Sequence, residues 1–312
     1  MVNNGSSNPT IGILYLGELG AALAESFLES NAKVVTTVQN RSERTQQTCQ
    51  RLGVECLETF DKVVQVAEIV FSVVPPSAAR CVAKEYATSV SKRAKRAVFV
   101  DLNSVGPEVI VGLENTIVSK GHGFVDAAVH GLAANLTHGA VIYVSGPDAE
   151  VVATHIPKSI HVRRIAGRAG AAATFKMLLA GFNKGLVAQF LELCLAAREA
   201  DLLGEFVERC YEYYPGVMDV TDRLMPSLGR HSRRRAEEMG ELVRTIELLG
   251  IRPGFANEIR RCFEHLSNAA ESTDVLSSPH ASSLMSVLDW LASTDGEHEA
   301  TSDIGPNGSV SP

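Results

Sequence analysis

The chain lacks the cysteine patterns of a zinc protein or a disulfide-stapled domain. Its six cysteines are scattered and none belongs to a C-x-x-C pair, so their spacing predicts neither a metal site nor a disulfide framework. We expect buried free thiols in a reducing compartment. A basic-then-apolar leader and an uninterrupted apolar run of about eighteen residues are also missing. These absences predict a cytosolic protein with no membrane contact and no bound metal.

An excess of positive charge is missing too. The 312 residues carry 36 acidic and 29 basic side chains, a net charge of −7, which argues against a nucleic-acid partner. Hydrophobic residues make up 45% of the chain, enough to bury a sizeable core, and the length suits two domains. Ser, Gly, Asn and Asp are frequent in residues 1–9 and 294–312, which we expect to be disordered tails.

The first half alternates between apolar runs and helical patterns. The runs are near-continuous, as in strands buried on both faces, and lie at 11–16, 33–38, 68–74, 97–102, 123–129 and 140–145. Helical patterns separate them at about 18–30, 43–52, 76–91 and 107–120. This rhythm predicts an α/β domain over residues 10–168, with a Rossmann-type, mostly parallel, doubly wound sheet.

The character of the sequence changes after Gly170. Residues 171–201 contain no proline and carry apolar side chains at helical spacing, which predicts one long interdomain helix. Residues 203–292 look helical throughout, so we predict an all-α C-terminal domain over residues 169–293. Within it, His231 to Leu249 has an amphipathic pattern, and its arginine-rich start is interpreted as a solvated helix face.

The first strand runs into a glycine-containing turn and a helix. In a G-x-G-x-x-G turn, small residues let the backbone approach a pyrophosphate at the helix N-terminus. Gly17 and Gly20 fit the second and third glycines, and Tyr15 stands at the first. The alternative is that both glycines only permit tight packing. The cofactor contacts predicted here are Leu16, Gly17, Glu18, Leu19 and Gly20.

The end of the second strand bears on the choice of cofactor. NAD-specific sites place a carboxylate there to hold the ribose 2′-hydroxyl, but this strand is followed by Asn40, Arg41 and Ser42. Arg41 could pair with a 2′-phosphate, and Ser42 could add a hydrogen bond. The alternative is a solvated turn before an ordinary helix. We favour NADP(H) as the cofactor.

The ordered set of motifs resembles the β-hydroxyacid dehydrogenase family, relatives of 6-phosphogluconate dehydrogenase. Six segments carry the resemblance, and they lie at 11–20, 40–42, 72–76, 101–107, 126–132 and 170–183. The remainder resembles the small helical domain of an uncharacterised branch, with the signature His231-Ser-Arg-Arg-Arg-Ala-Glu-Glu-Met. The resemblance implies a Rossmann domain and a helical domain that mediates homodimer formation.

The resemblance also implies which residue handles the proton. Lys176 takes the position of the family's catalytic lysine, a general acid or base; the alternative is a lysine that reaches the surface. Besides Tyr15 at the first glycine, three positions depart from the family pattern: Ala180 replaces an asparagine, His130 a serine and Leu132 a glycine. His130 is either a second proton donor or a pocket wall. The pocket is predicted to be more apolar than usual for the family.

Further contacts follow from the same segments. Val74, Pro75 and Asn103 are expected beside the cofactor, with Asn103 on the nicotinamide ribose or amide. Ser104, His130, Gly131 and Asn183 are expected beside the substrate; Asn183 lies about 10 Å along the helix axis from Lys176. Asn103 and Ser104 are also compatible with a helix cap before Pro107.

The sequence therefore predicts an NADP(H)-dependent oxidoreductase that acts on a small hydroxyl/carbonyl substrate. The first alternative is an imine reductase on the same scaffold, which the lysine disfavours and the missing asparagine leaves open. The second is a cofactor-binding sensor that has lost catalysis, suggested by Tyr15, Ala180 and His130. Turnover that depends on Lys176 would separate enzyme from sensor.

Overall fold

The computed structural model describes residues 8–272 and 283–295. The chain divides into two compact units, residues 1–176 and 177–312, and the division falls within one helix. Most of the two predicted tails lies outside the described residues, although the predicted second tail overlaps the end of helix α12 (Leu284–Asp295).

The first unit contains an eight-stranded sheet in the order β3-β2-β1-β4-β5-β6-β7-β8. Neighbouring strands are parallel except for β6 and β7, which are antiparallel. The predicted mostly parallel sheet is thus confirmed. All six predicted strands form, and β3 and β8 are additional. The strands are β1 (Ile11–Leu14), β2 (Val34–Thr37), β3 (Glu55–Leu57), β4 (Ile69–Ser72), β5 (Val98–Asp101), β6 (Gly123–His130), β7 (Val141–Ser145) and β8 (His161–Arg164).

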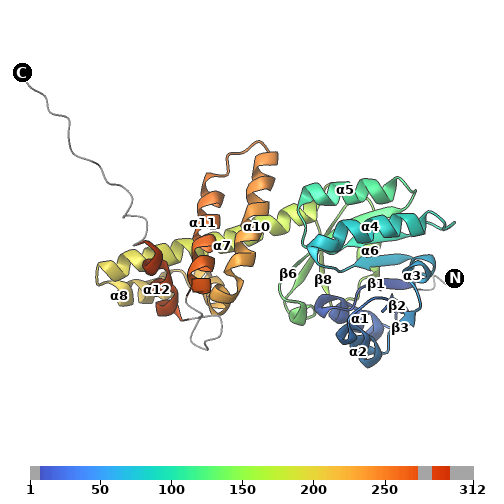
Figure 1. The fold of residues 1–312 in the computed structure, drawn as a ribbon, viewed down its shortest axis with the longest axis horizontal. Helices are drawn as coiled ribbons and strands as arrows, with labels where there is room; N and C mark the ends of the chain where they lie inside the picture. Colours follow the sequence, from blue (N-terminus) through green and yellow to red (C-terminus); the bar gives the residue numbers. More distant parts are fainter. Residues whose placement is uncertain (1–7, 273–282, 296–312) are drawn as a thin grey trace, which may run out of the picture. The chain divides into compact units, whose positions relative to one another are not determined.

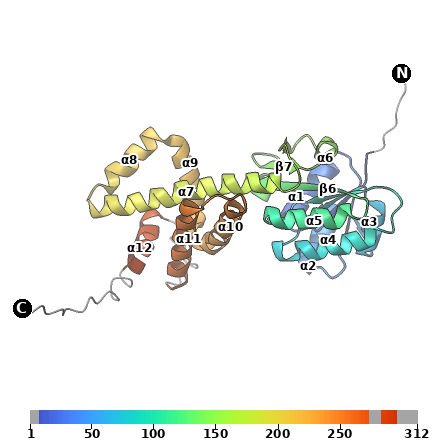
Figure 2. The same cartoon turned by 90° about the horizontal axis from the view of Figure 1, so that it is seen from above.

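Helices cover both faces of this sheet, so its central strands are buried on both sides (Figure 2). Ile13 of β1 packs in the core of the face covered by α1, α2 and α6, where the Phe27 and Phe71 rings are tilted against each other with centroids 5.5 Å apart. Leu14 joins the opposite core with Tyr86, under α3, α4 and α5. The helices are α1 (Glu18–Glu29), α2 (Glu43–Leu52), α3 (Phe60–Val66), α4 (Pro76–Val90), α5 (Pro107–Val118) and α6 (Ala149–His155), with a short 3₁₀ turn η1 (Ala133–Asn135).

The described part of the second unit is helical, as predicted. Its core is formed by side chains such as Val187, Leu191 and Phe263, and α10 and α11 lie side by side (Figure 1). The elements are α8 (Leu203–Tyr213), α9 (Pro215–Leu224), η2 (Met225–Ser227), α10 (Leu228–Leu248), α11 (Gly254–Ser272) and α12.

Helix α7 (Ala171–Glu199) is the long helix that the sequence predicts. By length and composition alone it is also apolar enough to cross a membrane, with a mean hydropathy of 1.3 over an 18-residue window. However, 44% of that window is buried within the protein, and its apolar residues contribute to the cores of both units. The helix therefore serves as a core helix, and the absence of a membrane span stays a prediction.

Two sequence interpretations are wrong. Cys49 and Cys56 form a disulfide rather than free thiols, because Gly53 adopts a left-handed φ of 66° and turns the chain from α2 back toward β3. The arginine-rich segment is not uniformly solvated either. Helix α10 begins before it, at Leu228, and Arg235 is only 4% exposed. Its Nη2 donates to Ser227 Oγ at 2.7 Å, and burial lowers its pKa to about 10.

Candidate functional site

The predicted site lies at the carboxyl edge of the parallel strands. Strands β1, β2, β4 and β5 all end at this edge, and the strand order reverses between β1 and β4. The loops that leave these four strands carry the predicted cofactor residues. Because ligands of open α/β sheets bind outside the strand ends at such a reversal point, this edge is the candidate site.

The two glycines of the first turn have different structural roles. A Cβ on Gly20 would collide with the carbonyl oxygen of Tyr15, so Gly20 permits the close approach of α1 to the turn. A Cβ on Gly17 would meet nothing within 4 Å, so packing does not require a glycine there. Gly17 is the N-cap of α1 and offers no side-chain acceptor, which leaves the first N–H groups available to an anion.

The other predicted residues of this turn differ in exposure. Leu16 is buried, Leu19 is half-buried against the core, and Glu18 is exposed in the first turn of α1. Side chains of Leu16 and Leu19 therefore hold the turn, and only the backbone of this stretch is placed to meet a pyrophosphate.

The turn after β2 presents a cation and a helix start. Asn40 adopts a left-handed φ of 58°, and Ser42 caps α2 by accepting the Thr45 N–H at 3.4 Å. Arg41 is exposed, and its guanidinium carbon lies 4.2 Å from the centroid of the Tyr15 ring. No ion pair of Arg41 with a carboxylate is present within residues 8–272 and 283–295. The turn thus presents an exposed guanidinium next to the capped start of α2.

The loops after β4 and β5 are joined by one amide. The Asn103 Nδ2 donates to Ser72 Oγ at 3.0 Å and to Asp101 Oδ1 at 2.6 Å, and its Oδ1 accepts the Val74 N–H at 2.7 Å. Val74 is half-buried and Pro75, the N-cap of α4, is exposed. Asn103 is only 6% exposed, so a contact with the nicotinamide half would require this network to open.

Two buried carboxyl groups lie side by side on β5 and β6. Asp101 and Asp126 are register partners, and both are fully buried. Burial raises the pKa of Asp101 to about 7, and the charge of Asp126 contributes to this rise. The hydrogen bonds from Asn103 lower the pKa and so oppose the rise. Burial also raises the pKa of Asp126, which hydrogen bonds from α7 and Ser145 oppose.

Asp126 fixes the start of α7. Its Oδ2 accepts hydrogen bonds from Ser145 Oγ at 2.9 Å and from three backbone N–H groups, those of Gly170, Ala172 and Ala173, at 2.9 to 3.1 Å. The Phe175 ring packs edge-on against Tyr143, with centroids 4.9 Å apart. A carboxylate at a helix N-terminus also complements the helix dipole. The first turns of α7 are therefore held firmly against the sheet.

Lys176 follows directly on this anchored segment. Its Nζ donates to Ser104 Oγ at 2.8 Å, so the lysine head lies at the strand edge beside the loop after β5. Ser104 is exposed, and neither Asn103 nor Ser104 caps α5, whose N-cap is Gly106. A lysine and a hydroxyl in contact at this edge can hold or transfer a proton at a shared oxygen.

The remaining predicted substrate residues are spread over other elements. His130 ends β6 and is half-buried, and Gly131 has a φ of 124°, with Ala140 too close to admit a Cβ. Leu132 is 68% exposed. Asn183 belongs to the second unit and is half-buried on α7. The first unit therefore brings Lys176 and Ser104 together, and Asn183 lies on the part of α7 that belongs to the second unit.

Sequence reasoning missed the roles of three residues: Tyr15 as a partner of Arg41, and Asp101 and Asp126 as a buried pair that braces the loops. Asp126 lies within a segment on which the family resemblance rests, but its partners are up to 47 residues away in the chain. No local signal indicates such a contact.

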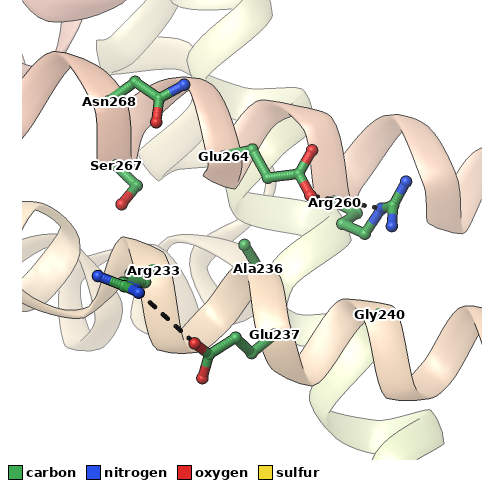
Figure 3. Close-up of a pocket in the computed structure, with 8 residues that line it drawn as sticks. All are labelled: Arg233, Ala236, Glu237, Gly240, Arg260, Glu264, Ser267 and Asn268. Carbon is green, nitrogen blue, oxygen red and sulfur yellow. Dashed lines mark ion pairs between the residues drawn. The ribbon is translucent and has the colours of Figure 1, made fainter.

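The second unit has a polar groove between α10 and α11, with a volume of about 440 Å³ (Figure 3). Arg233 faces Glu237 at 3.8 Å along α10, and Arg260 faces Glu264 at 3.7 Å along α11. None of the predicted site residues lines this groove. Among the described residues, no cluster of three or more His, Cys, Asp or Glu side chains could hold a metal ion.

Comparisons with known proteins agree with this geometry. Residues 10–158 match the NAD binding domain of 6-phosphogluconate dehydrogenase, and residues 197–266 match a domain of unknown function, DUF1932. An uncharacterised 28.5 kDa protein of Methanothermus fervidus is 28% identical over 82% of this chain and 98% of its own length.

Two solved structures share the fold. One is a conserved protein of unknown function described as similar to 3-hydroxyacid dehydrogenases; it is 25% identical, with a TM-score of 0.72 over 84% of this chain and 98% of that one. The other, 3-hydroxyisobutyrate dehydrogenase of Mycobacterium tuberculosis, is 13% identical, with a TM-score of 0.68 over 91% and 99%. Residues 10–158 thus form a nicotinamide-cofactor-binding domain of the 6-phosphogluconate dehydrogenase type, and they are followed by a helical domain of unknown function.

Proposed function

We propose that the protein is an NADP(H)-dependent oxidoreductase that interconverts a hydroxyl and a carbonyl group on a small molecule, with Lys176 as general acid and base. The observation that carries the proposal is the 2.8 Å hydrogen bond from Lys176 Nζ to Ser104 Oγ at the carboxyl edge of the sheet. This pair lies on the same unit as the glycine turn and Arg41, so one domain holds both the cofactor residues and the proton-transfer residue.

The residues at the sheet edge fit a dinucleotide. The open space at Gly17 and the free N–H groups at the start of α1 suit a pyrophosphate, and Arg41 suits the 2′-phosphate. When bound, the nicotinamide supplies or accepts the hydride. Asn40, Ser42, Val74 and Pro75 line the same edge of the sheet.

The proton is handled by this chain's own side chains. On oxidation, Lys176 in its neutral form takes the proton of the substrate hydroxyl; on reduction, the ammonium form returns it to the carbonyl oxygen. Ser104 accepts one Lys176 N–H and so fixes the direction of the others. Asp126 holds the helix that carries the lysine, and His130 and Gly131, at the end of β6, form one wall of the substrate pocket.

The proposal extends to the polarity of the substrate, the oligomeric state and the partners of the protein. Leu132 exposes an apolar side chain next to Gly131, which favours a substrate less polar than a simple hydroxy-carboxylate. Phe182 and Phe255 of the helical unit are 67% and 68% exposed, and burial of such side chains favours a homodimer formed through this unit. The acidic net charge suits an enzyme without nucleic-acid partners.

The experiment is a comparison of wild type, Lys176→Ala and the matched control Lys158→Ala, an exposed lysine of the same unit, against a panel of carbonyl and imine substrates with NADPH. Lys176→Ala should lower carbonyl turnover by about 100-fold or more and leave the dissociation constant for NADPH nearly unchanged. Equal turnover by wild type and Lys176→Ala would contradict the assigned role. Turnover of imines alone would favour the imine reductase, and tight NADPH binding without any turnover would favour the sensor.

A further inference from the structure

Tyr15 occupies the position of the first glycine in a G-x-G-x-x-G turn, yet its backbone forms hydrogen bonds within the turn. Its N–H donates to Val73 O at 3.3 Å, and its carbonyl accepts the Gly17 N–H at 3.0 Å. The side chain is half-buried and packs against the core under α4. Burial raises the pKa of the Tyr15 hydroxyl, and the nearby charge of Arg41 opposes the rise. The ring is therefore a fixed part of the sheet edge.

Arg41 is held against this ring. Its guanidinium carbon lies 4.2 Å from the ring centroid, and its Nε donates to the Gln39 carbonyl at 3.3 Å. A cation–π contact uses none of the guanidinium N–H groups as hydrogen-bond donors, so the two terminal nitrogens keep theirs. The ring thus orders a long and otherwise exposed side chain without occupying the atoms that bind a phosphate.

We propose that Tyr15 is a specificity-determining residue for the ribose 2′-phosphate of NADP(H), acting through Arg41. The inference rests on the proposed preference for NADP(H). Ordering an arginine on binding costs conformational entropy, and a ring that holds the guanidinium beforehand lowers this cost. NADH lacks the group that Arg41 would bind, so the ring should not affect its affinity.

The test uses the full-length protein with Tyr15→Leu, Tyr15→Phe, Arg41→Ala and the double variant Tyr15→Leu/Arg41→Ala. Dissociation constants are measured for NADPH and NADH, and for adenosine 2′,5′-bisphosphate and adenosine 5′-monophosphate, which isolate the 2′-phosphate. Tyr15→Leu should weaken NADPH and the bisphosphate about fivefold and leave NADH and the monophosphate within about twofold. Tyr15→Phe keeps the ring and should match wild type. The double variant should bind NADPH no more weakly than Arg41→Ala.

Three results would overturn the role of Tyr15: equal weakening of NADPH and NADH by Tyr15→Leu, weakening by Tyr15→Phe as large as that by Tyr15→Leu, or additive effects in the double variant. If Tyr15→Leu does not fold, Tyr15→Gly, which restores the usual glycine, takes its place in every comparison. Arg41→Ala separates the two proposals, because an equal effect on NADPH and NADH would refute the 2′-phosphate site itself. A selective Arg41 effect without a selective Tyr15 effect would refute only the inference.

Discussion

Replacement of Asp101 by asparagine should change how the stability of the first unit depends on pH. Asp101 is fully buried beside Asp126, and its pKa is raised from 3.8 to about 7, mainly by burial. The folded state therefore keeps a proton that the unfolded chain has already lost. Because the carboxyl pKa is higher in the folded state, the folded state becomes less stable as the pH rises from the pKa in the unfolded chain toward the pKa in the folded chain.

The size of this effect follows from the two pKa values. One pKa unit corresponds to about 1.4 kcal/mol, and between about pH 5 and pH 8 the free energy of unfolding should fall by about 2 to 3 kcal/mol through Asp101. Asparagine cannot ionise, so Asp101→Asn should remove this fall. One of its amide atoms will pair poorly with Asn103, since both Asp101 oxygens accept hydrogen bonds from Asn103. That cost is the same at both pH values and does not affect the slope.

The assay is urea unfolding of the full chain at the two pH values, followed by pulse-labelling hydrogen exchange and mass spectrometry of peptides from β5 and β6. These peptides report the first unit separately from the helical one. Glu25→Gln, which removes an exposed carboxylate on α1, is the control and should keep the wild-type slope. A wild-type slope in Asp101→Asn, or an equal change of slope in the control, would refute the reasoning.

Two further predictions concern the turn and the start of α7. Gly20→Ala should destabilise the first unit by about 2 kcal/mol or more, because its Cβ meets the Tyr15 carbonyl. Gly17→Ala should melt like wild type but bind NADPH more weakly. Thermal melts and NADPH titrations check both variants, and tight NADPH binding by Gly17→Ala would count against the pyrophosphate site. Asp126→Ala should lower the free energy of unfolding by about 3 kcal/mol, measured in urea, because buried N–H groups of α7 lose their acceptor. An unchanged urea midpoint for Asp126→Ala would contradict this role.

Most of the fold could be predicted because strands buried on both faces appear as continuous apolar runs. The elements that were missed lack this signal. The three residues of β3 are exposed or half-buried, and β8 (His161–Arg164) is mostly polar; both are outer strands that pair on one side only. Helices α3 and α6 have seven residues each, about two turns, too few for a 3.6-residue period to emerge.

The site could be predicted as far as chain order and sheet topology reach. Residues that follow parallel strands must meet at one edge, so Gly17, Arg41 and Ser104 could be assigned to one site from the sequence. Contacts between side chains that are distant in the chain could not be predicted from the sequence. The Asp126 cap on α7 and the Cys49–Cys56 disulfide depend on how neighbouring elements pack and turn, and no local pattern encodes them.

The departures from the family pattern are divided between the two units. Tyr15, His130 and Leu132 lie in the unit that also holds Lys176, whereas Ala180 lies beyond the division, in the unit with the domain of unknown function. The start of α7, which carries Lys176, is fixed within the first unit by Asp126, Ser145 and the Phe175–Tyr143 contact. Lys176 and the cofactor turn are therefore both held by contacts within the first unit. Ala180→Asn, a change beyond the division, should accordingly leave the dissociation constant for NADPH within about twofold of the wild-type value in an NADPH titration.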